Sequence, residues 1–168
     1  MASSRSSSAV SIPFLYSLFF LYIEPVSTFA GFYYAFFRQR EYMDMTMSHD
    51  LNILSSQDGS NVGVSTRESI VLNQLANMYL AFALNEGLVL RSTRDVHVWR
   101  VYLFVLLLAD FGHLYSVVGA GGSELYWQFW KWNAMYWGNL GFVYVGASFR
   151  IAFLLGIGLG QKSNKLKQ

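Results

Sequence analysis

The sequence predicts an all-α fold, namely an integral membrane bundle of four transmembrane helices. Of its 168 residues, 54% are hydrophobic and 13% are charged, whereas soluble domains usually carry about a quarter charged residues. The charged residues gather in the gaps between long apolar stretches. Each stretch is close to or above the roughly 20 residues that cross a bilayer as a helix. The four predicted spans are residues 13–37, 70–90, 99–119 and 137–160.

We expect these spans to form one membrane domain over residues 1–168. The first span, 13–37, is longer than the apolar core of a cleavable signal peptide, so it should remain as a helix. The serine-rich tail 1–12 is predicted to be disordered, and residues 161–168 form a basic tail. Because the connection 91–98 is short, the second and third spans should be antiparallel neighbours.

Four crossings would place both termini on the same side of the membrane. Lys and Arg are more numerous on that side, which favours cytosolic termini by the positive-inside rule. The residues compared are Arg5, Arg91, Arg94, Arg100, Lys162, Lys165 and Lys167 on the terminal side, and Arg38, Arg40, Arg67 and Lys131 on the other. We expect the protein in the endoplasmic reticulum membrane.

Charge and composition exclude several classes of function. The net charge of +2, without a basic helix, argues against a nucleic-acid partner. The chain has no cysteine, so disulfides, thiol nucleophiles and cysteine metal sites are excluded. Its three histidines lack the spacing of metal ligands. We therefore expect no metal and no cofactor.

Ionisable side chains lie inside the predicted spans. They are Glu24, Glu86, Asp110, His113 and Arg150. A charged group at mid-bilayer costs at least about 2.5–3.5 kcal/mol, so each is a candidate functional residue. At about 1.5 Å of rise per residue, Glu24, Asp110 and Arg150 fall in one middle layer. Asp110 and His113 are three residues apart on one helix, so their side chains should be able to meet.

Proline and polar side chains mark the same helix faces. Pro25 directly follows Glu24 and is expected to kink the first helix and free backbone carbonyl groups. Asn139 shares a stripe with Arg150, and Tyr79 shares one with Glu86. We expect such stripes to face one interior, because lipid cannot satisfy polar groups. The residues predicted to support a binding site are Arg150, Asn139, Asn77, Tyr79, Tyr115 and Trp137.

Segments in all four spans resemble a family of small fungal four-helix membrane proteins of unknown function. The segments are YIEPVSTFAGFYYAFF (22–37), NQLANMYLAFALNEGLVLRSTRDVHVWR (73–100), LLLADFGHLYS (106–116) and WGNLGFVYVGASFRIAFLLGIGLG (137–160). In architecture and residue type the chain is also distantly similar to emopamil-binding-protein-like isomerases, and to the membrane-bound terpene cyclases and epoxide-opening enzymes of fungal secondary metabolism. This resemblance implies acidic residues in a lipid-facing cavity that protonate an alkene or an epoxide. No motif carries an individual residue role to this chain.

These features predict a membrane-embedded acid/base enzyme for a lipophilic polyene or prenylated substrate. It would open an epoxide, by hydrolysis or cyclisation, or shift a double bond. Glu24 or Asp110 is the expected proton donor, and the other is the base or cation stabiliser. His113 would orient or reprotonate Asp110, Glu86 would relay protons, and Trp137 would offer an aromatic face to a carbocation. The expected partners are this substrate and membrane lipids.

Other interpretations stay open. Arg150 would pair with Glu24 or Asp110 as a buried clamp in a purely structural arrangement, with polar side chains joining the helices. The protein would then be a non-catalytic lipid-binding, sterol-binding or helper protein. A small transporter would instead use the acids and the histidine as a relay. The glycine-rich residues 156–160 would pack closely, either within one chain or across a homodimer.

Overall fold

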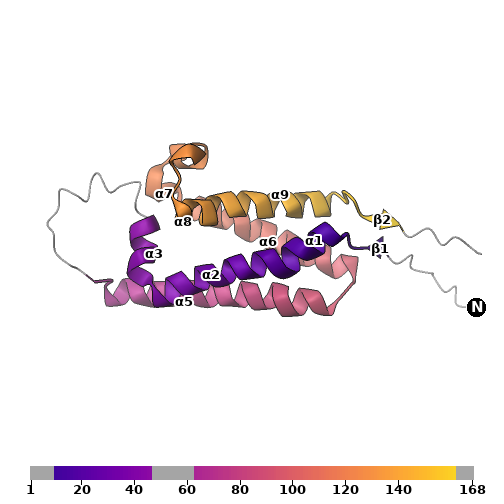
Figure 1. Cartoon of the computed structure of the whole chain (residues 1–168), viewed down its shortest axis with the longest axis horizontal. Coiled ribbons are helices and arrows are strands. Elements are labelled where there is room, and N and C mark those ends of the chain that lie inside the picture. Colours follow the sequence, from indigo (N-terminus) through magenta and orange to yellow (C-terminus); the bar gives the residue numbers. More distant parts are fainter. Residues whose placement is uncertain (1–9, 47–62, 162–168) are drawn as a thin grey trace, which may run out of the picture.

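The computed structural model describes residues 10–46 and 63–161, which are mostly helical (Figure 1). The predicted all-α class is therefore confirmed. The helices are α1 (Phe14–Leu18), α2 (Glu24–Phe37), α3 (Gln39–Thr46), α5 (Thr66–Leu84), α6 (Val96–Ser116), α7 (Val118–Gly121), α8 (Ala134–Tyr136) and α9 (Phe142–Leu154). The π-helical turns are η1 (Phe19–Ile23), η2 (Asn85–Val89) and η6 (Trp137–Gly141), and the 3₁₀ turns are η3 (Leu90–Ser92), η4 (Ser123–Tyr126) and η5 (Phe129–Lys131).

The first rod consists of α1, η1 and α2, and Pro25 explains its irregularity. Proline has no N–H group and its ring crowds the carbonyl four residues earlier, which here belongs to Leu21. The chain widens into the π-turn η1 immediately before the proline. The Leu21 carbonyl accepts a hydrogen bond from Nη2 of Arg91 at 3.1 Å. The freed carbonyl group predicted at Pro25 is thus found at Leu21.

The starts of two helices are set by capping side chains. α5 begins at Thr66, earlier than the predicted span, because Ser65 and Glu68 form a reciprocal capping box. α6 begins at Val96, where the Asp95 side chain accepts a hydrogen bond from the His97 amide at 2.8 Å. Such caps satisfy amide groups that have no partner inside the helix.

The end of the fourth helix differs from the prediction. α9 stops at Leu154, because Gly156 and Gly158 adopt φ of 79° and 76°, a region that other residues rarely enter. These glycines therefore form a turn instead of a helical packing face. The turn leads to β2 (Gly160–Gln161), which pairs antiparallel with β1 (Val10–Ser11). The predicted tail 1–12 is thus ordered at β1, while residues 1–9 and 162–168 lie outside the described residues.

The helices form two layers (Figure 1). α2 packs along α5, and α6 packs along α9. The short connection between α5 and α6 predicted that these two helices would be close neighbours, but α5 has its main contact with α2. At the end near β1 and β2 the layers meet in one hydrophobic cluster. Its buried members are Tyr16, Phe19, Phe20, Leu90, Trp99, Leu103, Leu106 and Phe153.

At the opposite end the layers diverge, and α3 crosses the opening (Figure 1). Tyr42 of α3 packs with Ala35, Leu72 and Ala76 of the α2–α5 layer. A separate small cluster of Leu125, Tyr136 and Leu140 lies beneath the turn that follows α7.

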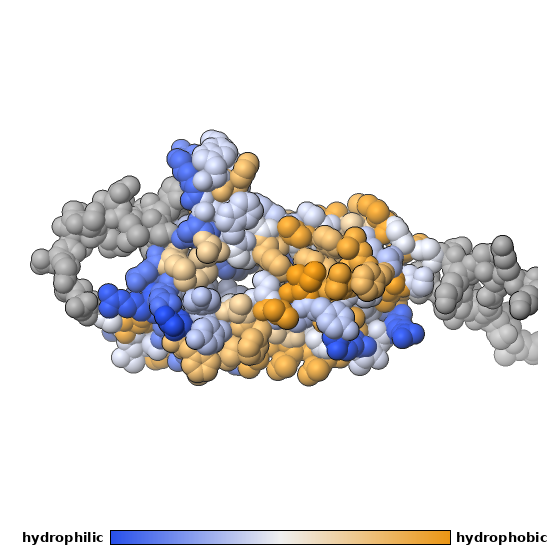
Figure 2. Space-filling model, viewed as in Figure 1, coloured by the Kyte–Doolittle hydropathy of each residue, from blue (hydrophilic) through white to orange (hydrophobic). Residues whose placement is uncertain are grey.

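Among the described residues, two helical segments are long and apolar enough to cross a membrane. They are Phe14–Phe37 and Val96–Ser116. Their length and composition suggest a membrane protein. Figure 2 shows hydrophobic residues over α1 and the adjoining half of α9, whereas hydrophilic residues gather near α3 and α7.

Candidate functional site

Arg150 lies at the centre of a buried ionic cluster that joins the two layers. Its side chain is only 4% exposed. Nη1 donates to Oδ2 of Asp110 at 2.8 Å, and Nη2 donates to Oε1 of Glu24. The same Nη2 lies 3.6 Å from Oε1 of Glu86. One guanidinium from α9 therefore reaches carboxyl groups from α2, η2 and α6.

Local structure explains how these side chains meet. Glu24 follows the π-turn η1, and Glu86 lies within the π-turn η2. A π-turn alters the helical phase and is often found at functional sites. Gly146 lies one turn before Arg150 on the same face of α9. Its spacing from Asn139 and Arg150 puts it on their polar stripe, but that spacing does not predict that it makes room for the guanidinium.

The cluster contains more acidic groups than basic ones. Glu24, Glu86 and Asp110 are all buried, and Arg150 is the cation they share. Three ionised carboxylates would leave two negative charges without compensation, which burial makes costly. Neither oxygen of Glu86 has a hydrogen-bond partner in the described part of the chain. The side chains of Glu86 and Glu24 do lie within hydrogen-bonding reach of each other, so a proton shared between them would satisfy both.

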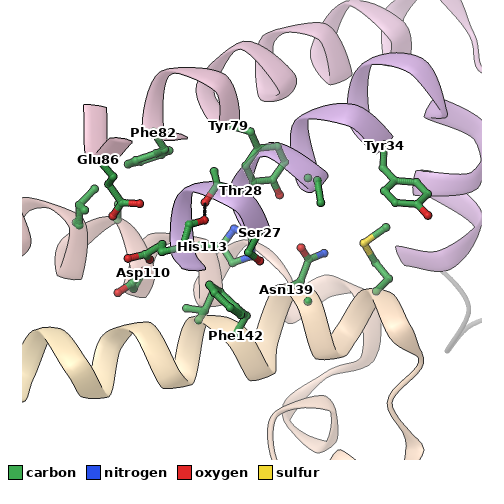
Figure 3. A pocket seen from close by; sticks show the side chains of 18 of the residues that line it. Ser27, Thr28, Tyr34, Tyr79, Phe82, Glu86, Asp110, His113, Asn139 and Phe142 are labelled. Atoms are coloured by element: carbon green, nitrogen blue, oxygen red, sulfur yellow. Dashed lines mark hydrogen bonds between the residues drawn. The ribbon is translucent and has the colours of Figure 1, made fainter. Parts of the chain in front are cut away.

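A cavity of about 300 Å³ opens beside this cluster, between the layers (Figure 3). The volume is at the lower end of the range for small-molecule sites. All four members of the ionic cluster line it, and apolar walls come from Phe82, Leu106, Phe142 and Val143. In the space-filling view the surface is hollowed between the α2–α5 layer and the α8–α9 segment (Figure 2). The cavity thus combines acidic groups with a mainly apolar lining.

A second polar group lies in the same region. The hydroxyl groups of Tyr42 and Tyr79 are 3.1 Å apart, and the Asn139 side chain also interacts with Tyr42. Burial raises the pKa of Tyr42, and the hydrogen bonds from Tyr79 and Asn139 partly oppose this rise. His113 interacts with the backbone of Asn139. Its Nε2 atom is buried and has no hydrogen-bond partner among the described residues.

The structure brings most of the predicted residues to this cavity. Glu24, Tyr79, Glu86, Asp110, His113, Asn139 and Arg150 all line it. The predicted contact between Asp110 and His113 is not found, because no hydrogen bond joins these two described side chains and His113 instead interacts with the backbone of Asn139 in η6. Figure 3 shows His113 and Asp110 entering the cavity from the same helix.

Three of the predicted residues, Asn77, Tyr115 and Trp137, do not line the cavity. Asn77 is exposed on α5, since it is two residues from Tyr79 and points to nearly the opposite face of the helix. Tyr115 is 80% exposed. Trp137 is 53% exposed, and its ring packs at 5.2 Å from that of Trp132. Polarity and depth predict an interior position for these three residues, but each of them lies on an exposed face of its helical segment.

The cluster does not suit a metal ion. In residues 10–46 and 63–161, no group of three His, Asp or Glu side chains is placed to hold one. The Arg150 guanidinium instead lies between the acidic groups. The cavity thus presents carboxyl, imidazole and guanidinium groups to a bound molecule.

Residues 9–160 match the family described as a domain of unknown function, DUF7704. The chain belongs to this family. The match includes all four long helical segments, the ionic cluster and the cavity, so this DUF7704 domain contains the complete candidate site. No curated protein and no solved structure matches the chain.

Proposed function

We propose that all four helical segments of this DUF7704 protein cross a membrane. The long exposed faces of α2 and α6 are apolar over their central turns, which suits contact with lipid. The pairing of β1 with β2 holds the two ends of the described chain together, as an even number of crossings requires. The exposed Trp127, Trp130 and Trp137 would lie at the headgroup level. The distribution of Lys and Arg favours cytosolic termini in the endoplasmic reticulum membrane.

Within this bundle we propose an acid/base enzyme that acts on a lipophilic polyene or prenylated substrate. The observation that carries the proposal is the excess of buried carboxyl groups beside a mainly apolar cavity. An apolar substrate would enter between α2 and the α8–α9 segment, where the surface is hollowed. The reaction would open an epoxide, by hydrolysis or cyclisation, or move a double bond. The distant similarity to isomerases and to fungal terpene cyclases agrees with this chemistry.

The contacts of Arg150 favour Glu86 as the proton donor. Arg150 hydrogen-bonds Glu24 and Asp110, and such charge-assisted bonds favour their carboxylate forms. Glu86 receives no hydrogen bond from Arg150 and is therefore the group best placed to remain neutral. This assignment replaces the relay role expected for Glu86. The two carboxylates held by Arg150 would act as base and cation stabiliser.

In the proposed epoxide opening, Glu86 donates a proton, and one of the two carboxylates held by Arg150 accepts the proton released at the end. The Glu86 proton moves to the epoxide oxygen, while a carbon–oxygen bond breaks and its electron pair stays on that oxygen. The cationic carbon is then attacked by water or by an alkene of the same substrate. Asp110 or Glu24 takes the proton released in the last step. Because the side chains of Glu24 and Glu86 lie within hydrogen-bonding reach of each other, a proton on Glu24 can return to Glu86.

Substitution of Glu86 by Gln tests this proposal, because Gln keeps the shape and removes the acidic proton. We expect Glu86→Gln to lower turnover of a terminal-epoxide polyprenyl substrate in proteoliposomes by at least about 10²-fold, the lower limit typical of lost acid catalysis. Tyr115→Phe, on the exposed side of α6, is the matched control and should retain activity. Full activity of folded Glu86→Gln would refute the assignment of the acid.

A structural role for the same cluster is the second candidate, because Arg150 contacts acids from three other helical segments. In that case the protein is a lipid-binding or helper protein whose cavity does no chemistry. Glu24→Gln and Asp110→Asn would then lower folded yield, and adding Arg150→Met would restore it. Catalytic roles predict folded but inactive single variants. Proton or solute flux in proteoliposomes would instead indicate a transporter.

A further inference from the structure

The outer face of α5 carries an unpartnered heptad stripe. Its positions are separated alternately by four and three residues, the spacing that two packed helices use. We call these residues the α5 seam: Ile70, Gln74, Asn77, Ala81, Leu84 and Leu88. All six are exposed. They lie opposite the buried face of α5, where Leu72, Ala76 and Ala83 pack.

The seam differs from the other exposed helix faces. Over the central turns of α6, the exposed side chains are apolar, as at Val101, Val105 and Leu108. α2 likewise exposes Val26 and Phe29. The centre of the α5 seam instead exposes two amide side chains followed by the small Ala81. If α5 crosses the membrane as proposed above, these amides cannot simply face lipid.

The seam amides lack partners within the described structure. No hydrogen bond is formed there by the side chain of Gln74 or Asn77, whereas their neighbours are satisfied. Asn73 accepts a hydrogen bond from Gln39 at 2.8 Å, and Asn85 donates one to the Ala81 carbonyl at 2.8 Å. Among the amide side chains of α5, those that make no hydrogen bond to a described residue are therefore Gln74 and Asn77, and both lie in the seam.

We propose that the α5 seam packs against the α5 seam of a second copy of this chain. An amide both donates and accepts, so Gln74 and Asn77 are complementary to the same residues of an identical chain. A twofold axis along the membrane normal would bring two parallel α5 helices together, and Ala81 would allow their backbones to approach closely. A polar residue in such a stripe also fixes the register of the pair. The proposal rests on the membrane crossing of α5 and not on the enzymatic activity.

This dimer differs from the glycine-mediated alternative. The glycine-rich end of the fourth span is not a continuous helical face, because Gly156 and Gly158 have positive φ values. The seam, in contrast, lies on one continuous α-helix from Ile70 to Leu84, and Leu88 follows in the π-turn η2. The two ionic clusters would lie on the far sides of the two α5 helices, so each copy keeps its own cavity.

Disulfide cross-linking in native membranes tests the seam directly, because the chain contains no cysteine. We expect Ala81→Cys to form a covalent dimer of twice 19.1 kDa on mild oxidation. The matched control is Leu108→Cys, on the exposed face of α6, which should form at least about tenfold less dimer. Adding Gln74→Leu and Asn77→Leu to Ala81→Cys should lower the dimer yield about tenfold, because the amide pairs are lost.

The outcomes separate this proposal from the proposed function. Equal cross-linking of Ala81→Cys and Leu108→Cys, or no effect of the two Leu substitutions, would overturn the seam. Labelling of Ala81→Cys alone by a membrane-impermeant maleimide would also overturn it, because the seam would then face water. Labelling of both Ala81→Cys and Leu108→Cys by this reagent would instead contradict the membrane embedding of α5 and α6. Loss of turnover in Glu86→Gln has no bearing on cross-linking.

Discussion

Gly146 provides the space that the Arg150 guanidinium occupies. A Cβ atom at Gly146 would lie 2.6 Å from Nη1 of Arg150 and 3.3 Å from Oε1 of Glu24. The Arg150 side chain therefore lies back along its own helix, over the preceding turn, where the acidic groups of the other helices reach it. The ionic cluster therefore depends on the glycine at position 146 as well as on its charges.

Gly146→Ala is accordingly expected to displace Arg150 and destabilise the fold by about 1–3 kcal/mol, the usual cost of overpacking a tight site. Gly112→Ala is the control, since no atom lies within 4 Å of a Cβ at that position in α6. It should be neutral or slightly stabilising, by up to about 1 kcal/mol. Thermal unfolding of the detergent-solubilised variants gives the comparison. Equal stability of the two variants would contradict the packing argument.

Arg150→Met should be among the most damaging single substitutions, because it leaves several acidic groups buried without their cation. Loss of one partner of a buried ion pair costs about 3–5 kcal/mol. Combining Arg150→Met with Glu24→Gln and Asp110→Asn should recover much of that loss, because the charges disappear together. Arg94→Met, at an exposed position, controls for the loss of an arginine. The folded yield and the denaturant midpoint of unfolding measure the recovered stability. A triple variant as unstable as Arg150→Met alone would contradict the prediction that the loss comes from unpaired buried charge.

The sequence predicted the helices and the membership of the cluster better than its pairings. The common depth of Glu24, Asp110 and Arg150 follows from rise per residue alone, and they do meet. The Arg150 guanidinium also reaches Glu86, because of the π-turn η2 and the way the two layers converge. The pattern of apolar residues in the sequence does not predict either feature. The spacing on its helix predicts a contact between His113 and Asp110, but the imidazole interacts with the backbone of Asn139 in η6.

Asn77 is a second residue whose orientation the sequence pattern does not predict. Polarity within a span predicted that it would face the interior, but the buried face of α5 is set by Leu72, Ala76 and Ala83. The outward amide then needs another explanation, which the α5 seam supplies. At the end of α9, the glycine run predicted close packing, whereas the positive φ at Gly156 and Gly158 redirects the chain. A glycine pattern does not by itself distinguish these outcomes.

Pro25→Ala should reduce the dependence of the fold on Arg91. In the natural chain, Arg91 donates to the Leu21 carbonyl, which Pro25 leaves without an amide donor. Alanine at position 25 restores that donor, so Arg91→Ala should cost about 0.5–1.5 kcal/mol in the natural chain and less in Pro25→Ala. A double-mutant cycle of the unfolding free energies measures this coupling. Additive effects would show that the hydrogen bond contributes nothing to stability.

The capping box of α5 predicts a pH dependence at that end of the helix. The hydrogen bonds with Ser65 lower the pKa of Glu68 below its usual value. A lowered pKa means that the folded form favours the carboxylate, so the stabilisation is present above the pKa of the unfolded chain, near 4.3. It is lost as the pH falls through the lower pKa of the folded chain. Amide hydrogen exchange at residues 66–69 should therefore speed up in acid, relative to the centre of α5. Glu68→Gln retains the capping box but cannot titrate, so it should abolish the faster exchange of residues 66–69 in acid. An unchanged acid response in Glu68→Gln would assign the effect to another group.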